Sequence, residues 1–120
     1  MKSLICVVVP VGKAPYQHEI PNTLEAMQQL VGGLIEPVRL SNRLILICDE
    51  EAKINGKEGN RRIGSEIIAR QFFIVADGSD GDFASLDKYE VAAMLSRFAT
   101  PENIPPEEVE GSIKMTFIEW

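Results

Sequence analysis

The hydrophobic positions of the chain fall first into short, continuous runs that predict buried strands. Such runs occupy Leu4–Val9, most of Arg43–Cys48, and Phe72–Ala76. Apolar runs of about 4–8 residues between turn residues are typical of strands that are covered on both faces. We therefore expect Leu4–Val9 to be a central strand of the sheet.

Interrupted patterns predict the remaining strands and a hairpin. Tyr16–Ile20 is a short extended segment that ends before Pro21, because a proline disfavours helical geometry in the residue before it. Leu34–Leu40 and Arg43–Cys48 are separated only by a Ser-Asn pair, which is the spacing of a β-hairpin.

Helical periodicity follows Pro21. Asn22 is a favourable N-cap and Glu25 completes a pattern similar to a capping box, while Gly32 and Gly33 end the helix. The apolar positions share one face: Leu24, Met27, Leu30 and Val31.

A second helix is predicted over Leu86–Phe98, with Ser85 as its N-cap. Its apolar face is formed by Tyr89, Ala93, Met94 and Phe98. Ile63–Arg70 has an ambiguous pattern, which we interpret as one helical turn.

The end of the chain predicts a connection followed by a strand. Residues 99–111 hold three prolines and four glutamates and are expected to form a semi-rigid, solvated connection. Residues 112–120 predict a strand that is apolar on both faces, and such a strand either completes the sheet or contacts a partner subunit. The second outcome would make the protein a homo-oligomer.

Together these elements predict one α+β domain over residues 1–120. We expect a mixed, mostly antiparallel sheet with two helices packed on one face. A chain of 120 residues with 45% hydrophobic side chains is long enough to bury one core.

Charge is unevenly distributed along the chain. The net charge is −6, and residues 77–111 alone carry nine acidic and two basic side chains. We therefore do not expect direct nucleic-acid binding. Residues 53–70 are the one basic concentration, with five basic and two acidic side chains.

The two cysteines indicate a reducing compartment. Cys6 and Cys48 lie inside apolar runs and are predicted to be buried thiols, with a disulfide between them as the alternative. The apolar run near the N-terminus is too short to span a bilayer, so we expect a cytoplasmic protein without a membrane contact.

No catalytic or metal site is predicted, and no cofactor. Asp49 and its two following glutamates are adjacent in sequence, so they point in different directions and indicate a solvated loop start. The aspartates near Asp77 fail the calcium-loop pattern, because its sixth position is Asp82 and its twelfth is Lys88. His18, the only histidine, is expected to be exposed.

Four segments carry a resemblance to a known family. PYQHEIPNTLEAMQQLVGGLIEPV, ICDEEAKINGKEGNRR, FFIVADG and DFASL resemble, in order and in register, a family of small proteins of unknown function encoded mainly by phages, plasmids and conjugative elements. The resemblance covers residues 4–98 and implies a mobile-element origin and a small α+β domain, but no chemistry. The chain departs from the family at Asp49, where Asn is frequent, and at Gln71, where Gly is frequent.

The candidate binding site lies in the basic stretch after the strand Arg43–Cys48. Its polar set could line a pocket for a small anionic or nucleotide-like ligand, with arginines making bidentate phosphate contacts. The candidate residues are Glu51, Lys53, Asn55, Asn60, Arg61 and Arg62. In the alternative interpretation, the two asparagines serve turns and the charged side chains are solvated.

Three functional hypotheses follow. The first is a non-enzymatic binding protein of a mobile element, for example a counter-defence factor that sequesters a host protein or a small nucleotide signal. The second is an acidic mimic of nucleic acid that inhibits a DNA-binding enzyme through residues 77–111. The third is a small enzyme of an unrecognised type.

Overall fold

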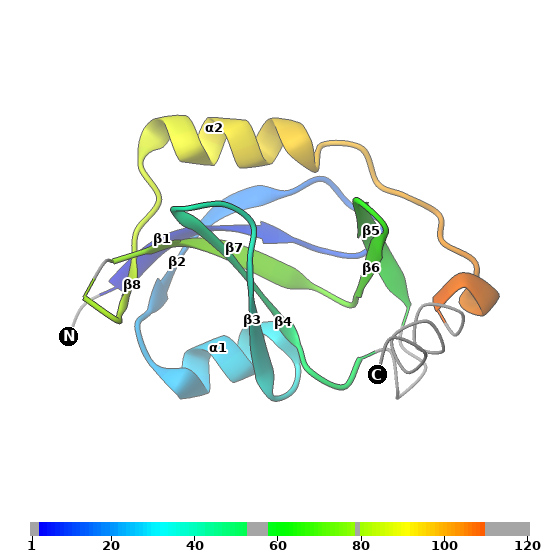
Figure 1. Cartoon of the computed structure of the whole chain (residues 1–120), viewed down its shortest axis with the longest axis horizontal. Helices are drawn as coiled ribbons and strands as arrows, with labels where there is room; N and C mark the ends of the chain where they lie inside the picture. Colours follow the sequence, from blue (N-terminus) through cyan, green and yellow to red (C-terminus); the bar gives the residue numbers. More distant parts are fainter. Residues whose placement is uncertain (1–2, 53–57, 79, 110–120) are drawn as a thin grey trace.

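A central antiparallel sheet organises the computed structural model, which describes residues 3–52, 58–78 and 80–109. Its strand order is β2-β1-β7-β4-β3, with β8 paired to β7, and every described pairing is antiparallel (Figure 1). These strands are β1 Ser3–Val9, β2 Tyr16–Pro21, β3 Ile35–Arg39, β4 Leu44–Asp49, β7 Phe72–Asp77 and β8 Phe83–Ala84. The predicted α+β class, the central strand over Leu4–Val9 and the β3–β4 hairpin are confirmed.

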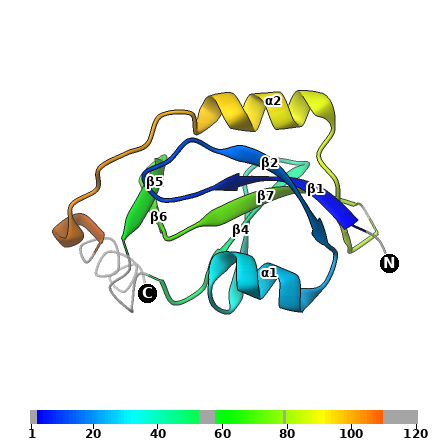
Figure 2. The same ribbon diagram turned by 180° about the vertical axis from the view of Figure 1, so that it is seen from behind.

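The two helices lie on opposite faces of this sheet, as Figures 1 and 2 show, and not on one face as expected. The reason is the alternation of side chains along the interior strands. In β1, Cys6 and Val8 join the core beneath α1, whereas Val7 and Val9 join the core beneath α2. Because both faces of the sheet are apolar, each needs its own helix to exclude water.

The N-caps of the two helices lie one and two residues after the predicted ones. Helix α1 spans Leu24–Val31, and the Thr23 hydroxyl, not the Asn22 side chain, accepts a hydrogen bond from the Ala26 amide at 3.2 Å. The C-cap of α1 is Gly32, with φ 85°, as the glycine pair predicts.

Helix α2 spans Lys88–Arg97 and starts from a capping box between Asp87 and Glu90. The predicted cap, Ser85, instead accepts a hydrogen bond from the Ile5 amide at 2.9 Å and holds β1. The predicted apolar face is partly wrong, because Tyr89 is 74% exposed and Val91 is buried beside Met94 and Phe98.

The segment predicted as a helical turn is part of a second hairpin. Strands β5 Gly59–Ile63 and β6 Glu66–Ala69 form a separate two-stranded sheet, with Gly64 at φ 60° in the turn between them. Ile67 and Ile68 point to opposite sides of β6 and both are buried, Ile68 against the α2 core and Ile67 against residues 104 and 109. Burial on both sides favours a strand over a single helical turn.

The connection after α2 is more ordered than predicted. Ile104 and Val109 are buried, and residues 106–109 form a helical turn. The predicted strand over 112–120 lies outside the described residues. No helix in the described ranges has both the length and the apolar character needed to cross a membrane.

Cys6 is completely buried in β1, and burial raises the pKa of its thiol from 9.0 to about 12. Cys6 of the folded protein should therefore resist iodoacetamide at pH 8, because its thiolate fraction is about a thousandfold below that of a free thiol. The raised folded-state pKa also means that stability is intact below pH 9 and is lost as the pH rises from 9 towards about 12. Urea unfolding against pH should show a smaller alkaline loss in Cys6→Ala, and an identical loss in both proteins would contradict the assignment.

Candidate functional site

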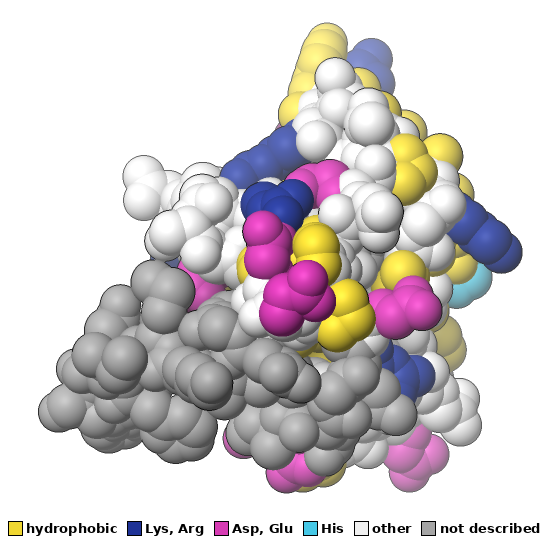
Figure 3. Space-filling model, turned by 90° about the vertical axis from the view of Figure 1, so that its right-hand side faces the viewer, with side chains coloured by type: hydrophobic (Ala, Val, Ile, Leu, Met, Phe, Trp, Pro, Cys, Tyr) yellow, Lys and Arg dark blue, Asp and Glu magenta, His cyan; other side chains and the backbone are white. Residues whose placement is uncertain are grey.

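The predicted site residues that the structure describes lie at one end of the molecule, which carries the β5–β6 hairpin and residues 100–109 and is here called the β5–β6 end. Figure 3 faces this end and shows basic, acidic and hydrophobic side chains intermixed on it. Lys53 and Asn55 lie outside the described residues. Glu51 is exposed in the turn after β4, where its amide donates to Asp49 Oδ1 at 3.0 Å.

Asn60 of β5 is fully buried and links its strand to two other segments of the chain. Its Nδ2 donates to the carbonyl oxygens of Val9 and Arg70, at 2.8 and 2.7 Å. Its Oδ1 accepts from Arg61 Nη1 at 2.6 Å. The end of β1, the end of β6 and strand β5 are therefore joined through this one amide.

Arg61 is 1% exposed and donates to oxygens from three parts of the chain. Phe98 O accepts from Nε and Nη2 at 3.3 and 2.9 Å, and Lys13 O accepts from Nη2 at 2.8 Å. Nη1 donates to Asn60 O at 3.2 Å as well as to the Asn60 side chain. Burial lowers the pKa of Arg61, and the charge of Glu102 opposes that shift.

The Arg61 guanidinium also lies against the carboxyl end of α2, where exposed carbonyls make a cation favourable. Together, Asn60 and Arg61 lock the β1–β2 turn, β5 and α2 into one arrangement. Their polar groups contact acceptors and donors of the chain itself, and a direct ligand contact by either residue stays a prediction.

Arg62 is exposed and points away from this network. Its Nη1 donates to Glu102 Oε1 at 3.2 Å, its Nη2 donates to Glu108 Oε2, and its amide donates to Glu102 Oε2 at 3.1 Å. Hydrogen bonds that the Arg62 guanidinium donates to Glu108 and Glu102 raise its pKa. The side chain therefore has two carboxylate partners from residues 100–109.

A second group of polar side chains at this end surrounds the glycine pair after α1. The Arg70 guanidinium lies against Gly32, where a Cβ would be 2.3 Å from Nη2. The Asp49 carboxylate lies against Gly33, where a Cβ would be 2.8 Å from Oδ1. Each glycine thus leaves space for one charged group, and Arg70 Nη1 is 4.0 Å from Asp49 Oδ2.

Arg70 stands in an unusual backbone conformation. Its φ is 64°, and it is the one non-glycine residue with positive φ in the described ranges. The conformation is held from both sides, since its amide donates to Glu58 O at 2.8 Å and its carbonyl accepts from Asn60. Residues held in sparsely populated backbone regions cluster at functional sites.

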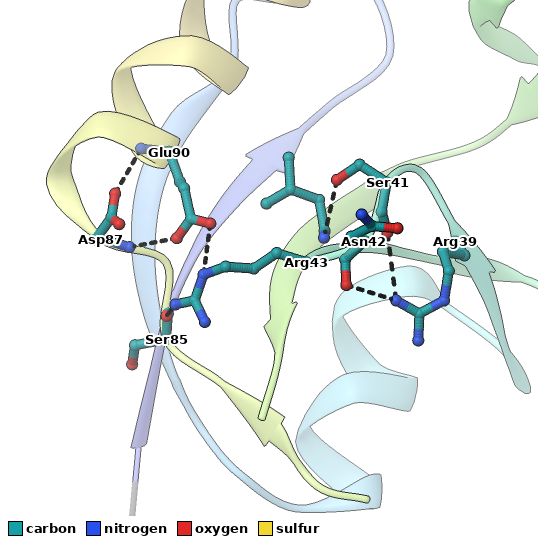
Figure 4. Close-up of polar contacts among 8 residues, drawn as sticks. Arg39, Ser41, Asn42, Arg43, Ser85, Asp87 and Glu90 are labelled. Carbon is teal, nitrogen blue, oxygen red and sulfur yellow. Dashed lines mark hydrogen bonds and ion pairs between the residues drawn. The ribbon is translucent and has the colours of Figure 1, made fainter. Parts of the chain in front are cut away.

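The opposite end of the molecule also has polar clusters, but their donors are occupied. Figure 4 shows Arg39 donating to the carbonyls of Ser41 and Asn42, and Arg43 pairing with Glu90 at 2.7 Å. A pocket of ≈ 350 Å³ at this end is lined by Arg39, Ile45, Asp77, Gly81, Asp82 and Phe83. Arg39 Nη2 donates to Asp77 Oδ2 at 2.7 Å, so the arginine that lines this pocket is already bound by the chain.

The basic stretch predicted from the sequence lies in part at this end, whereas Arg70 is not among the predicted site residues. A turn that forces a non-glycine residue to positive φ has no mark in the sequence, and Gly32 and Gly33 indicated only the end of α1. No group of three or more His, Cys, Asp or Glu side chains in ranges 3–52, 58–78 and 80–109 is placed to hold a metal ion.

Comparison with known proteins identifies a family and no activity. No curated protein and no solved structure matches the chain. A family model described as a domain of unknown function (DUF3846) matches residues 1–99, which confirms the resemblance to a family of unknown function. The chain therefore belongs to the DUF3846 family.

Proposed function

We propose that this protein is a non-enzymatic binding protein that holds a small anionic ligand, such as the phosphate of a nucleotide, on the guanidinium of Arg70. One observation carries the proposal: a half-buried guanidinium on a strained backbone has no hydrogen-bond acceptor among the described residues. Its side chain is 35% exposed, so a ligand can reach it.

The other described arginines differ from Arg70 in how their donors are used. Hydrogen bonds to acceptors of the chain engage the side chains of Arg39, Arg43, Arg61 and Arg62. Arg97 is exposed in the last turn of α2, with its guanidinium 5.3 Å from the centre of the Phe98 ring. Arg70 is thus the described arginine that is held in place and has no hydrogen-bond acceptor within ranges 3–52, 58–78 and 80–109.

The Arg70 side chain suits an anionic group. A guanidinium presents a rigid fork of donors that matches a carboxylate or a phosphate, and Gly32 lets the backbone approach it closely without a collision. Asp49 is 4.0 Å away, which is too far for a hydrogen bond, so its charge can position the guanidinium without using the donors.

The biological role that we propose for this binder follows the family resemblance. A phage or plasmid protein that sequesters a small nucleotide signal, or a host protein through an acidic or phosphorylated group, would counter a host defence. Arg62, also exposed at the β5–β6 end, has its donors engaged by Glu102 and Glu108, so Arg70 is the group to which we assign the ligand.

Calorimetric titration with inorganic pyrophosphate and with a nucleoside diphosphate tests the assignment. Arg70→Ala should weaken binding about 10- to 100-fold, because charge-assisted hydrogen bonds are lost. Arg97→Ala removes the same charge from an exposed site and should leave the affinity unchanged. Equal affinities of Arg70→Ala and the unmodified protein would exclude Arg70 as the ligand contact.

A second variant tests the same site with Arg70 intact. Gly32→Ala should also weaken binding, because its Cβ would collide with the guanidinium. Gly12→Ala is the matched control: Gly12 has a similar φ of 70°, but a Cβ there meets nothing within 4 Å. If both variants bind alike, the position of the guanidinium does not matter and the proposal fails.

The acidic-mimic hypothesis has less support from the geometry. Four carboxylates of residues 77–109 are partly neutralised by arginines: Asp77 by Arg39, Glu90 by Arg43, and Glu102 and Glu108 by Arg62. Duplex DNA carries one charge per ~1.7 Å of its axis, and paired carboxylates do not approach that density.

A further inference from the structure

The ten residues that follow the family domain cover part of it. The family match ends at residue 99, and residues 100–109, here called the strap, run down beside the β5–β6 hairpin (Figures 1 and 2). The strap touches the hairpin through an apolar contact and an ionic contact.

The apolar contact is a small cluster of its own. Ile104 and Val109 of the strap are 8% and 3% exposed and pack with Ile67 of β6. Gly59 makes the space for them, since a Cβ at that position would lie 2.9 Å from Ile104 Cβ and 3.1 Å from Val109 Cγ2. Gly59 and Ile67 of the hairpin therefore form an apolar contact surface for two aliphatic side chains.

The ionic contact places carboxylates on both sides of one guanidinium. Glu102 accepts from the Arg62 amide and from Nη1, at 3.1 and 3.2 Å, and Glu108 accepts from Nη2. A backbone amide and a guanidinium that converge on one carboxylate are a recurring arrangement for recognition of acidic groups.

We propose that the hairpin surface formed by Gly59, Arg62 and Ile67 is a docking site for an acidic, aliphatic segment of another protein, and that the strap occupies this site as an internal ligand. The sequence of the strap indicates the chemistry of the partner segment. Glu102 is followed two positions later by Ile104, and Glu108 is followed directly by Val109. The proposal does not depend on Arg70 and goes beyond the anionic-ligand function.

The strap is held in a way that allows exchange. Two buried aliphatic side chains favour the closed arrangement, whereas the order imposed on ten backbone residues opposes it. The ion pairs of Arg62 are solvent-exposed and add little. An external segment of the same pattern can therefore compete with the strap.

Fluorescence anisotropy with a labelled synthetic peptide of residues 99–110 tests the proposal on the full-length chain. The double variant Ile104→Asp/Val109→Asp releases the strap while leaving the docking surface intact. It should bind the peptide at least about tenfold more tightly than the unmodified protein, because the internal competitor is removed. Adding Arg62→Ala should reverse part of that gain, whereas Arg43→Ala, which removes an exposed, ion-paired arginine at the opposite end, should not.

A peptide with Ile104→Asp is the control on the ligand side and should not bind. A second, milder release variant, Glu102→Gln/Glu108→Gln, guards against loss of fold. If neither folded release variant binds the peptide more tightly than the unmodified protein, or if Arg62→Ala has no effect, the docking surface is refuted. If both variants unfold by circular dichroism, the strap is part of the core and the proposal is likewise overturned.

Discussion

Arg61→Ala should destabilise the protein by about 3–5 kcal/mol, because the variant leaves several buried carbonyl groups without a donor. In the native protein the guanidinium is 1% exposed and satisfies the carbonyls of Phe98 and Lys13 together with the amide oxygen of Asn60. A loss of this size is a large part of the total stability of a domain. Urea unfolding monitored by circular dichroism measures it directly.

Two neighbouring variants serve as controls for Arg61. Arg61→Lys retains the charge but lacks the planar guanidinium that donates to several acceptors at once. Its free energy of unfolding should therefore lie between those of the native protein and Arg61→Ala. Arg62→Ala removes an exposed arginine next to it in sequence and should show only a small fraction of the loss. If Arg61→Ala unfolds at the same urea concentration as Arg62→Ala, the buried lock does not contribute as described.

Phe72→Ala should cost a similar amount, about 3–5 kcal/mol, through the cavity that it leaves in the core. Phe72 is fully buried in β7, and its ring packs edge-to-face on Phe98 with 5.3 Å between centroids. The change therefore removes apolar contacts on the sheet face covered by α2 and the aromatic pair that fixes the end of α2.

Tyr89→Ala is the matched aromatic control on α2. Tyr89 is 74% exposed, so its replacement should change the free energy of unfolding by no more than about 0.5 kcal/mol. Thermal and urea unfolding of both variants measure the difference. Equal effects of Phe72→Ala and Tyr89→Ala would contradict the assignment of Phe72 to the core.

The apolar patterns predicted the main sheet well and its helical layers less well. Leu4–Val9 and Phe72–Ala76 are strands because continuous apolar runs need cover on both sides. A sheet that is apolar on both faces needs a helix on each face. The apolar pattern of a strand does not indicate on which face the next helix packs. The β5–β6 hairpin was missed because its residues include Asn60 and Arg61, which read as polar loop residues until burial is known.

The candidate site shows the same division between local and long-range information. The basic stretch and the glycine pair are visible in the sequence, and residues 58–70 and the glycine pair lie at the β5–β6 end. Contacts between Arg70 and Gly32, or between Arg62 and Glu102, join residues that are about 40 positions apart and have no local signature. The strained backbone of Arg70 likewise depends on a turn held by Glu58 and Asn60.

Mass spectrometry of the purified, full-length protein under native and then denaturing conditions tests the central claim most directly, after exposure of the protein to lysate of the cells that express it. The account predicts a stoichiometric extra mass under native conditions that is lost on denaturation, is absent from Arg70→Ala and is retained by Arg97→Ala. A bare protein mass in every sample, or an extra mass that Arg70→Ala retains in full, would contradict an anionic ligand held by Arg70.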